Sequence, residues 1–115
     1  MNKFLKSFGY AFNGLFYAFN TQLNFKVHCL VAIVVIALGL YVDLTRSEWL
    51  WIALSIVLVI VVELLNTGME LIVDLLSPER QAKAGAIKDL AAAAVLFSAI
   101  FAIAVGFSVF VPKLI

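Results

Sequence analysis

Residues 61–76 read VVELLNTGMELIVDLL, and this stretch decides the fold of the chain. Four polar side chains interrupt it at spacings of three, four and four residues, which on a helix form one narrow stripe. The preceding residues 49–62, WLWIALSIVLVIVV, are typical of a membrane span, where ionisable groups usually face a protein interior or an aqueous cavity. We therefore interpret the stripe as a functional site; the alternative is a polar seam that only holds helices together. Its members are Glu63, Asn66, Glu70 and Asp74.

The composition indicates a membrane protein. Hydrophobic residues make up 65% of the 115 residues and charged residues 13%, whereas soluble domains average roughly 45–50% and 25%. The length fits a single domain covering residues 1–115. The net charge of +1 predicts no nucleic-acid partner. The single Cys29 excludes an intrachain disulfide, and the N-terminal stretch lacks the pattern of a cleavable signal peptide, so we expect it to stay on the mature protein.

Hydropathy and periodicity predict an all-α integral membrane protein. Aromatic residues recur at helical spacing over residues 3–20 with lysines mostly on the other side, which is typical of an amphipathic helix on the membrane surface. Three apolar segments predict transmembrane helices at about 25–42, 48–76 and 88–111. The second of these would be roughly 43 Å long, more than the roughly 30 Å of the hydrocarbon core, so one end must project into water.

The distribution of basic residues predicts the orientation in the membrane. Six lie on the side of the N terminus and of residues 77–89, and two lie on the other side, which places the N terminus in the cytoplasm. Glu70, Asp74, Lys88 and Asp89 then gather at the cytoplasmic membrane surface, with Glu63 a turn or two deeper. The six are Lys3, Lys6, Lys26, Arg80, Lys83 and Lys88, and the two are Arg46 and Lys113.

These residue types suit phosphoryl transfer to a lipid. Mg²⁺ is typically held by one or two carboxylates together with substrate phosphates, and a lysine offers a point charge to a phosphate. A deeper carboxylate such as Glu63 could act as general base toward a lipid hydroxyl while a nucleotide arrives from water. The sequence contains neither a Walker P-loop nor a kinase glycine-rich loop. From the residues alone, a lipid kinase is therefore one option among several.

Two multi-part motifs extend this interpretation. ELLNTGMELIVDLLSPE (63–79), followed by KDLAAAAVL (88–96), resembles the small prokaryotic diacylglycerol kinase and undecaprenol kinase family. That family has a Glu-x-x-Asn-Ser/Thr-x-x-Glu-x-x-x-Asp run and a downstream Lys-Asp before small residues. The resemblance extends to FGYAFNGLFYAF (8–19) and NFKVH (24–28), so it covers nearly the whole chain. NFKVH and the ending FVPKL (110–114) are more similar to the undecaprenol kinase branch.

The resemblance implies an architecture and an activity. It implies a domain-sharing homotrimer in the bacterial cytoplasmic (inner) membrane, built from three-span subunits that each carry an N-terminal surface helix. It also implies ATP-dependent, Mg²⁺-assisted phosphorylation of a lipid alcohol, either undecaprenol or diacylglycerol, in active sites between subunits.

Site residues follow from the resemblance position by position. Glu63 matches the general base that meets the lipid alcohol, and Glu70 matches a metal-bridging carboxylate. The family commonly has a second metal-ligating glutamate where this chain has Gln22, whose neutral amide would coordinate Mg²⁺ with less charge. Asn66 and Asp74 match motif positions expected to orient Glu63 and Lys88. The nucleotide-binding positions are Lys3, Tyr10, Gln22, Glu70, Glu79, Arg80, Gln81, Lys88 and Asp89.

Two other interpretations remain open at this point. A small proton-coupled membrane transporter would use an intramembrane glutamate, but such proteins usually have more spans and a carboxylate near the midplane. A non-enzymatic membrane subunit explains the three spans but not the combination of carboxylates with a lysine. We interpret His28 as a capping or interface histidine, because no second histidine or cysteine cluster accompanies it.

Overall fold

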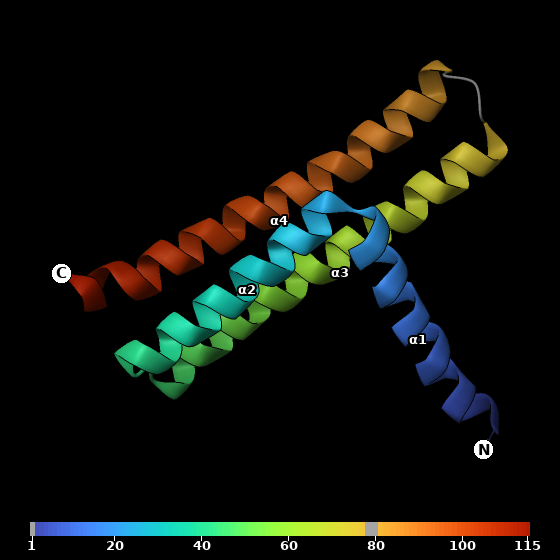
Figure 1. Cartoon of the computed structure of the whole chain (residues 1–115). Helices are drawn as coiled ribbons and strands as arrows, with labels where there is room; N and C mark the ends of the chain where they lie inside the picture. The colour runs from blue at the N-terminus through green and yellow to red at the C-terminus, as the bar shows by residue number, and fades with distance from the viewer. Residues whose placement is uncertain (1, 78–80) are drawn as a thin grey trace.

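The computed structural model describes residues 2–77 and 81–115, and this part of the chain is helical apart from short connections (Figure 1). Three of its helices are long and apolar enough to cross a membrane, which confirms the predicted all-α class and the three apolar segments. The helices are α1 (Asn2–Thr21), α2 (Leu23–Val42), α3 (Arg46–Leu76) and α4 (Ala82–Leu114).

The helices α3 and α4 are both longer than a bilayer requires. At 1.5 Å per residue, the 31 residues of α3 extend about 46 Å, compared with roughly 30 Å of hydrocarbon. In Figure 1 the last turns of α3 and the first turns of α4 extend together beyond the start of α2. The expected segment 88–111 lies inside α4, which continues through Pro112 to Leu114. A proline this close to the helix end removes only one backbone donor, and the helix still ends with the N–H of Ile115 bonded to the Val111 carbonyl.

The α2–α3 connection is a tight hairpin with capped ends. Asp43 adopts a left-handed conformation with φ of 54°, and its N–H bonds back to the carbonyl of Gly39. Thr45 and Glu48 then form a capping box: the Thr45 hydroxyl accepts from the Glu48 N–H at 3.2 Å, and the Thr45 N–H donates to the Glu48 carboxylate at 2.9 Å. A Cβ on Gly39 would lie 2.7 Å from the ring of Trp49, so only glycine permits this close approach.

Most of the packing lies between α3 and α4, and α2 packs against the N-terminal half of α3 and the C-terminal half of α4. A buried apolar cluster lies near the α2–α3 hairpin, and the C-terminal end of α4 closes it. There the Lys113 ammonium lies 3.0 Å from the Glu48 carboxylate and donates to the Asp43 carbonyl at 3.4 Å. The buried members of the cluster are Ile52, Val105, Val109 and Phe110.

The outward faces of the three long helices are strongly apolar. Leu30 and Ile33 on α2 are 63% and 65% exposed, and similar side chains cover α3 and α4. A soluble monomer rarely exposes apolar patches of this size, so these faces suit contact with lipid.

Helix α1 diverges from the other three and meets α2 and α3 at its C-terminal end (Figure 1). Ala18, in its last turn, is buried, whereas Phe4, Phe8 and Phe12 are more than half exposed. Only Gln22 separates α1 from α2, and its extended backbone gives the chain its change of direction.

Candidate active site

Glu63 lies in the middle of the bundle on α3. Its side chain is 2% exposed, although it carries the most polar group in an otherwise apolar part of the helix. Its Oε1 is 3.4 Å from Nε2 of His28 on α2, a close contact that falls short of a hydrogen bond. The Thr67 hydroxyl does not reach the carboxylate, because it donates to the backbone carbonyl of Glu63 at 3.0 Å.

The remaining members of the stripe become more exposed toward the end of α3. Asn66 is half-buried, and within the described ranges its Oδ1, like Oε1 of Glu63, accepts no hydrogen bond. Glu70 is half-buried, and the side chain of Asp74 is 63% exposed. The stripe therefore leads from a buried carboxylate to solvent along a single helix face.

Helix α4 contributes the cation of the site. The Lys88 ammonium donates to Oδ1 of Asp74 at 2.7 Å, which ties the exposed ends of α3 and α4 together. An ammonium group has three protons to donate, so this contact leaves Lys88 able to bind an anion as well. Asp89, the next residue, is exposed.

Glu70 lies one turn from Asp74 on the stripe, whereas the predicted nucleotide residues of α1 are on a helix that diverges from it. Lys3 and Tyr10 are exposed on α1, and no hydrogen bond or ion pair joins either side chain to the α3 stripe in residues 2–77 and 81–115. Gln81 is exposed and precedes the first turn of α4 as its N-cap. Glu79 and Arg80 lie outside the described residues.

A divalent cation would find few protein ligands here. Among the described residues, no group of three or more His, Cys, Asp or Glu is arranged to hold a metal. Glu70 supplies one carboxylate. The Gln22 amide donates through Nε2 to the Thr21 hydroxyl at 3.3 Å, a bond that does not use its oxygen. This donor set fits Mg²⁺ held largely by phosphates and water, and does not fit an all-protein cage.

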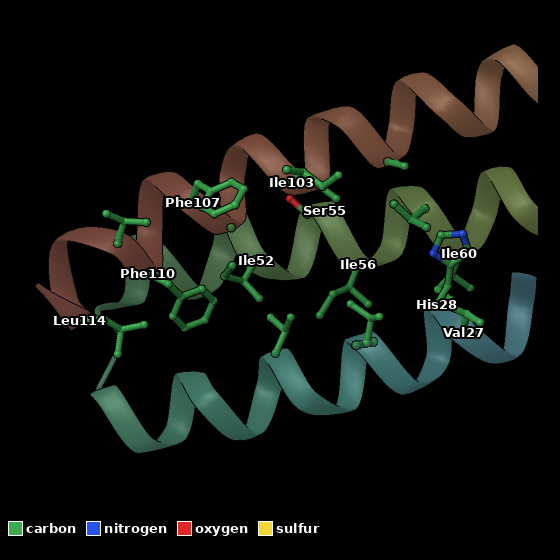
Figure 2. A pocket seen from close by; sticks show the side chains of 18 residues that line it. Val27, His28, Ile52, Ser55, Ile56, Ile60, Ile103, Phe107, Phe110 and Leu114 are labelled. Carbon is green, nitrogen blue, oxygen red and sulfur yellow. The ribbon is translucent and has the colours of Figure 1, made fainter.

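An apolar cleft of about 520 Å³ lies between α2, α3 and α4. Figure 2 shows His28 at one end of it and Phe110 and Leu114 at the other. Because His28 also contacts Glu63, the cleft ends beside the buried carboxylate. Nearly every other lining side chain is aliphatic or aromatic, so the cleft suits a hydrocarbon chain.

Sequence reasoning did not place His28 in this site. One signal was present: His28 lies 15 residues before the loop at residues 43–45 and Glu63 lies 18 residues after it, a difference of less than one helical turn. Two antiparallel helices with the same rise per residue bring such positions to the same level. Hairpin geometry could therefore have predicted the contact.

Comparison with known proteins agrees with the motifs. The family model described as prokaryotic diacylglycerol kinase matches residues 9–110. The chain is 39% identical to the undecaprenol kinase of Bacillus subtilis over 114 residues, which cover 99% of this chain and 93% of that protein. It is 40% identical to the diacylglycerol kinase of Synechocystis over 112 residues, 96% of this chain and 64% of that protein.

A more distant relative is the diacylglycerol kinase of Escherichia coli K12, which is 28% identical over 101 residues, 88% of this chain and 83% of that protein. The matches run through α1, the α3 stripe and the start of α4, so they are not confined to apolar segments. They confirm the family predicted from the two motifs. The chain therefore belongs to the prokaryotic diacylglycerol kinase family and is a lipid kinase.

Proposed function

We propose that the protein transfers the γ-phosphoryl group of ATP to the hydroxyl of a lipid alcohol at the cytoplasmic face of the bacterial membrane. Undecaprenol is the preferred substrate of this proposal, and diacylglycerol is the second candidate. The observation that carries this proposal is the position of Glu63. Its carboxylate is buried between an apolar cleft on one side and a stripe leading to solvent on the other. A lipid alcohol and a water-soluble nucleotide could meet there. Undecaprenol is preferred because NFKVH and FVPKL resemble that branch, and the relative named for it aligns over nearly its full length.

In the proposed reaction Glu63 accepts the proton of the lipid hydroxyl. The hydroxyl oxygen forms a bond to the γ-phosphorus, the bond from that phosphorus to the β–γ bridging oxygen breaks, and ADP leaves. Lys88 offsets negative charge on the phosphates, since phosphoryl transfer depends mainly on positioning and electrostatic stabilisation. Glu70 and Gln22 would hold Mg²⁺, which neutralises phosphate charge when bound.

The apolar cleft would take the hydrocarbon chain of the lipid. It is lined by aliphatic and aromatic side chains of all three long helices and ends at His28. A chain lying in the cleft with its alcohol toward the histidine end would place the hydroxyl near Glu63. Burial of each CH₂ group stabilises such a complex by about 0.8 kcal/mol, which favours long-chain substrates.

Helix α1 would lie on the cytoplasmic membrane surface. Its exposed Phe4, Phe8 and Phe12 suit insertion among lipid headgroups, while its lysines would remain in water. Three subunits would assemble so that Lys3 and Tyr10 complete a nucleotide site at a subunit interface. Neither side chain is joined to the α3 stripe of its own chain within the described residues.

The direct test is a kinase assay in detergent micelles with Mg·ATP and a panel of lipid alcohols that includes undecaprenol and diacylglycerol. For wild-type protein we expect a phosphorylated lipid, and for Glu63→Gln a kcat lower by about 10²–10⁴, the usual contribution of a general base. Glu48→Gln is the matched control, because Glu48 is another glutamate of α3 but lies in its first turn, far from the polar stripe. This variant should keep most of the activity.

Two results would contradict the proposal. If purified wild-type protein phosphorylates no lipid alcohol in the panel, the substrate class is wrong. If Glu63→Gln turns over at the wild-type rate, Glu63 is not the base. Proton flux in liposomes without lipid-dependent ATP consumption would instead favour the transporter interpretation.

A further inference from the structure

His28 is the only histidine in the chain, and it contacts the most deeply buried carboxylate of residues 2–77 and 81–115. Its Nε2 lies 3.4 Å from Oε1 of Glu63, and its own side chain is 24% exposed. A buried carboxylate oxygen without a hydrogen bond is costly, so a donor at this position has a direct energetic role. Catalytic hydrogen bonds are often long without substrate and shorten when substrate binds, which fits a contact of this length.

Other potential donors are engaged elsewhere or too far along the helices. The Thr67 hydroxyl bonds to the Glu63 backbone, and the Lys88 ammonium bonds to Asp74. Lys113 is paired with Glu48 at the opposite end of the bundle. Within the described part of the chain, His28 is the side chain with a nitrogen in contact with Oε1 of Glu63, and it approaches from a different helix, whereas Asn66 lies one turn along α3 itself.

The α2–α3 hairpin holds this contact in register. Both residues lie within one helical turn of the same level above a loop whose ends are fixed by the Asp43 turn and the Thr45 capping box. The close approach of Gly39 to Trp49 further restricts sliding between the two helices. His28 is therefore presented to Glu63 by a rigid connection, and this is the usual requirement for a residue that orients a catalytic group.

We propose that His28 is a positioning residue for Glu63. The imidazole donates its Nε2–H to Oε1 of Glu63 and so directs the other carboxylate oxygen toward the lipid hydroxyl. This assignment rests on the proposed lipid kinase reaction with Glu63 as base. His28 does not contact the transferring phosphoryl group, so it acts only through the carboxylate.

The kinetic test compares His28→Phe, which keeps a flat ring without a donor, with His28→Gln, which keeps an N–H donor. We expect kcat to fall about ten- to a hundredfold in His28→Phe, the range for losing a hydrogen bond to a charged group. KM for ATP should stay unchanged, and His28→Gln should recover most of kcat. Cys29→Ala, a half-buried neighbour on α2, serves as the control with wild-type kcat. Wild-type kcat in His28→Phe, or equal losses in both histidine variants, would overturn the assignment.

A spectroscopic test does not depend on activity. Because the chain has one histidine, protein labelled with ¹⁵N-histidine gives imidazole signals from His28 alone. The wild-type spectrum should show the Nε2–H tautomer, and Glu63→Gln should shift the Nε2 signal while Glu70→Gln leaves it in place. An Nε2 signal that is the same in wild type and Glu63→Gln would overturn the contact. A shifted signal in a protein that phosphorylates no lipid would leave the contact standing and sink only the proposed function.

Discussion

Two lysine–carboxylate pairs join α4 to α3 in residues 2–77 and 81–115, and they allow a catalytic role of Lys88 to be separated from a structural one. Lys88 lies 2.7 Å from Asp74 at the polar end of the bundle. Lys113 lies 3.0 Å from Glu48 at the opposite end. Lys88→Gln and Lys113→Gln each remove one such pair, but only the first removes a charge that the proposed reaction uses.

The structure gives the expected size of each effect. The side chains of Lys88 and Asp74 are 40% and 63% exposed, and ion pairs so exposed contribute at most about 1 kcal/mol to stability after solvent screening. The Lys113 pair is less exposed, and its lysine also donates to the Asp43 carbonyl, so Lys113→Gln should destabilise the fold at least as much. Loss of one charged donor to a reacting phosphoryl group should lower kcat by about 10²–10³, far more than the stability change explains.

The assay measures kcat, KM for ATP and the thermal unfolding midpoint of wild type and both variants in the same detergent. We expect Lys88→Gln to unfold close to wild type with a large loss of kcat, and Lys113→Gln to unfold earlier with nearly normal kcat at a temperature below both midpoints. Comparable activity losses in the two variants, or wild-type kcat in Lys88→Gln, would refute the catalytic role of Lys88.

Two further substitutions test the cleft and the metal site. Gly106 lines the cleft and has open space where a Cβ would lie, so the leucine of Gly106→Leu should fit on α4 but occupy space that lipid needs. If two CH₂ groups of the lipid lose their burial, KM for a long-chain alcohol should rise about tenfold. Ala104→Leu, exposed on the same helix outside the cleft, is the control; equal KM values in the two variants would argue that lipid binds elsewhere. Gln22→Glu adds a second carboxylate to the Mg²⁺ ligands, so half-maximal activity should need several-fold less Mg²⁺. An unchanged Mg²⁺ titration would remove Gln22 from the metal site.

The helices could be predicted because a bilayer leaves the backbone few choices. Every N–H and C=O in the hydrocarbon must be bonded within the protein, so an apolar stretch of sufficient length becomes a helix.

The ends of the helices were harder to predict than the helices themselves. Residues 82–86 are charged or small and could belong to a connection or to the first turns of a helix; in the structure they are helical from Ala82. Pro112 indicated an end, but the last turn of α4 tolerates it.

The relative rotation of the helices could not be read from the sequence. Periodicity placed the four polar residues on one face of α3, but it did not show which face of α2 packs against Glu63. His28 consequently had no visible partner, although its level in the hairpin was fixed by the short loop. The cleft could not be predicted for the same reason. Its lining comes from three helices that are apolar on nearly all sides, so the sequence does not show which side of each helix faces the cleft. Mean hydropathy alone does not distinguish a cleft-lining side chain from a lipid-facing one.

The spacing along α3 decides how a result for Lys88 bears on the quaternary structure. Glu63 and Asp74 are eleven residues apart, or about 16 Å along the helix axis, and Lys88 lies at the level of Asp74. Breaking the ion pair between Lys88 and Asp74 costs little free energy, because both side chains are exposed. A lysine side chain is nevertheless too short to cover that distance and touch a phosphoryl group beside Glu63 of its own chain. A rise in KM for ATP in Lys88→Gln would therefore place Lys88 on the outer phosphates of a nucleotide lying along the stripe. A fall in kcat would require the lysine to come from a neighbouring subunit, which is the arrangement expected of a trimer with shared active sites.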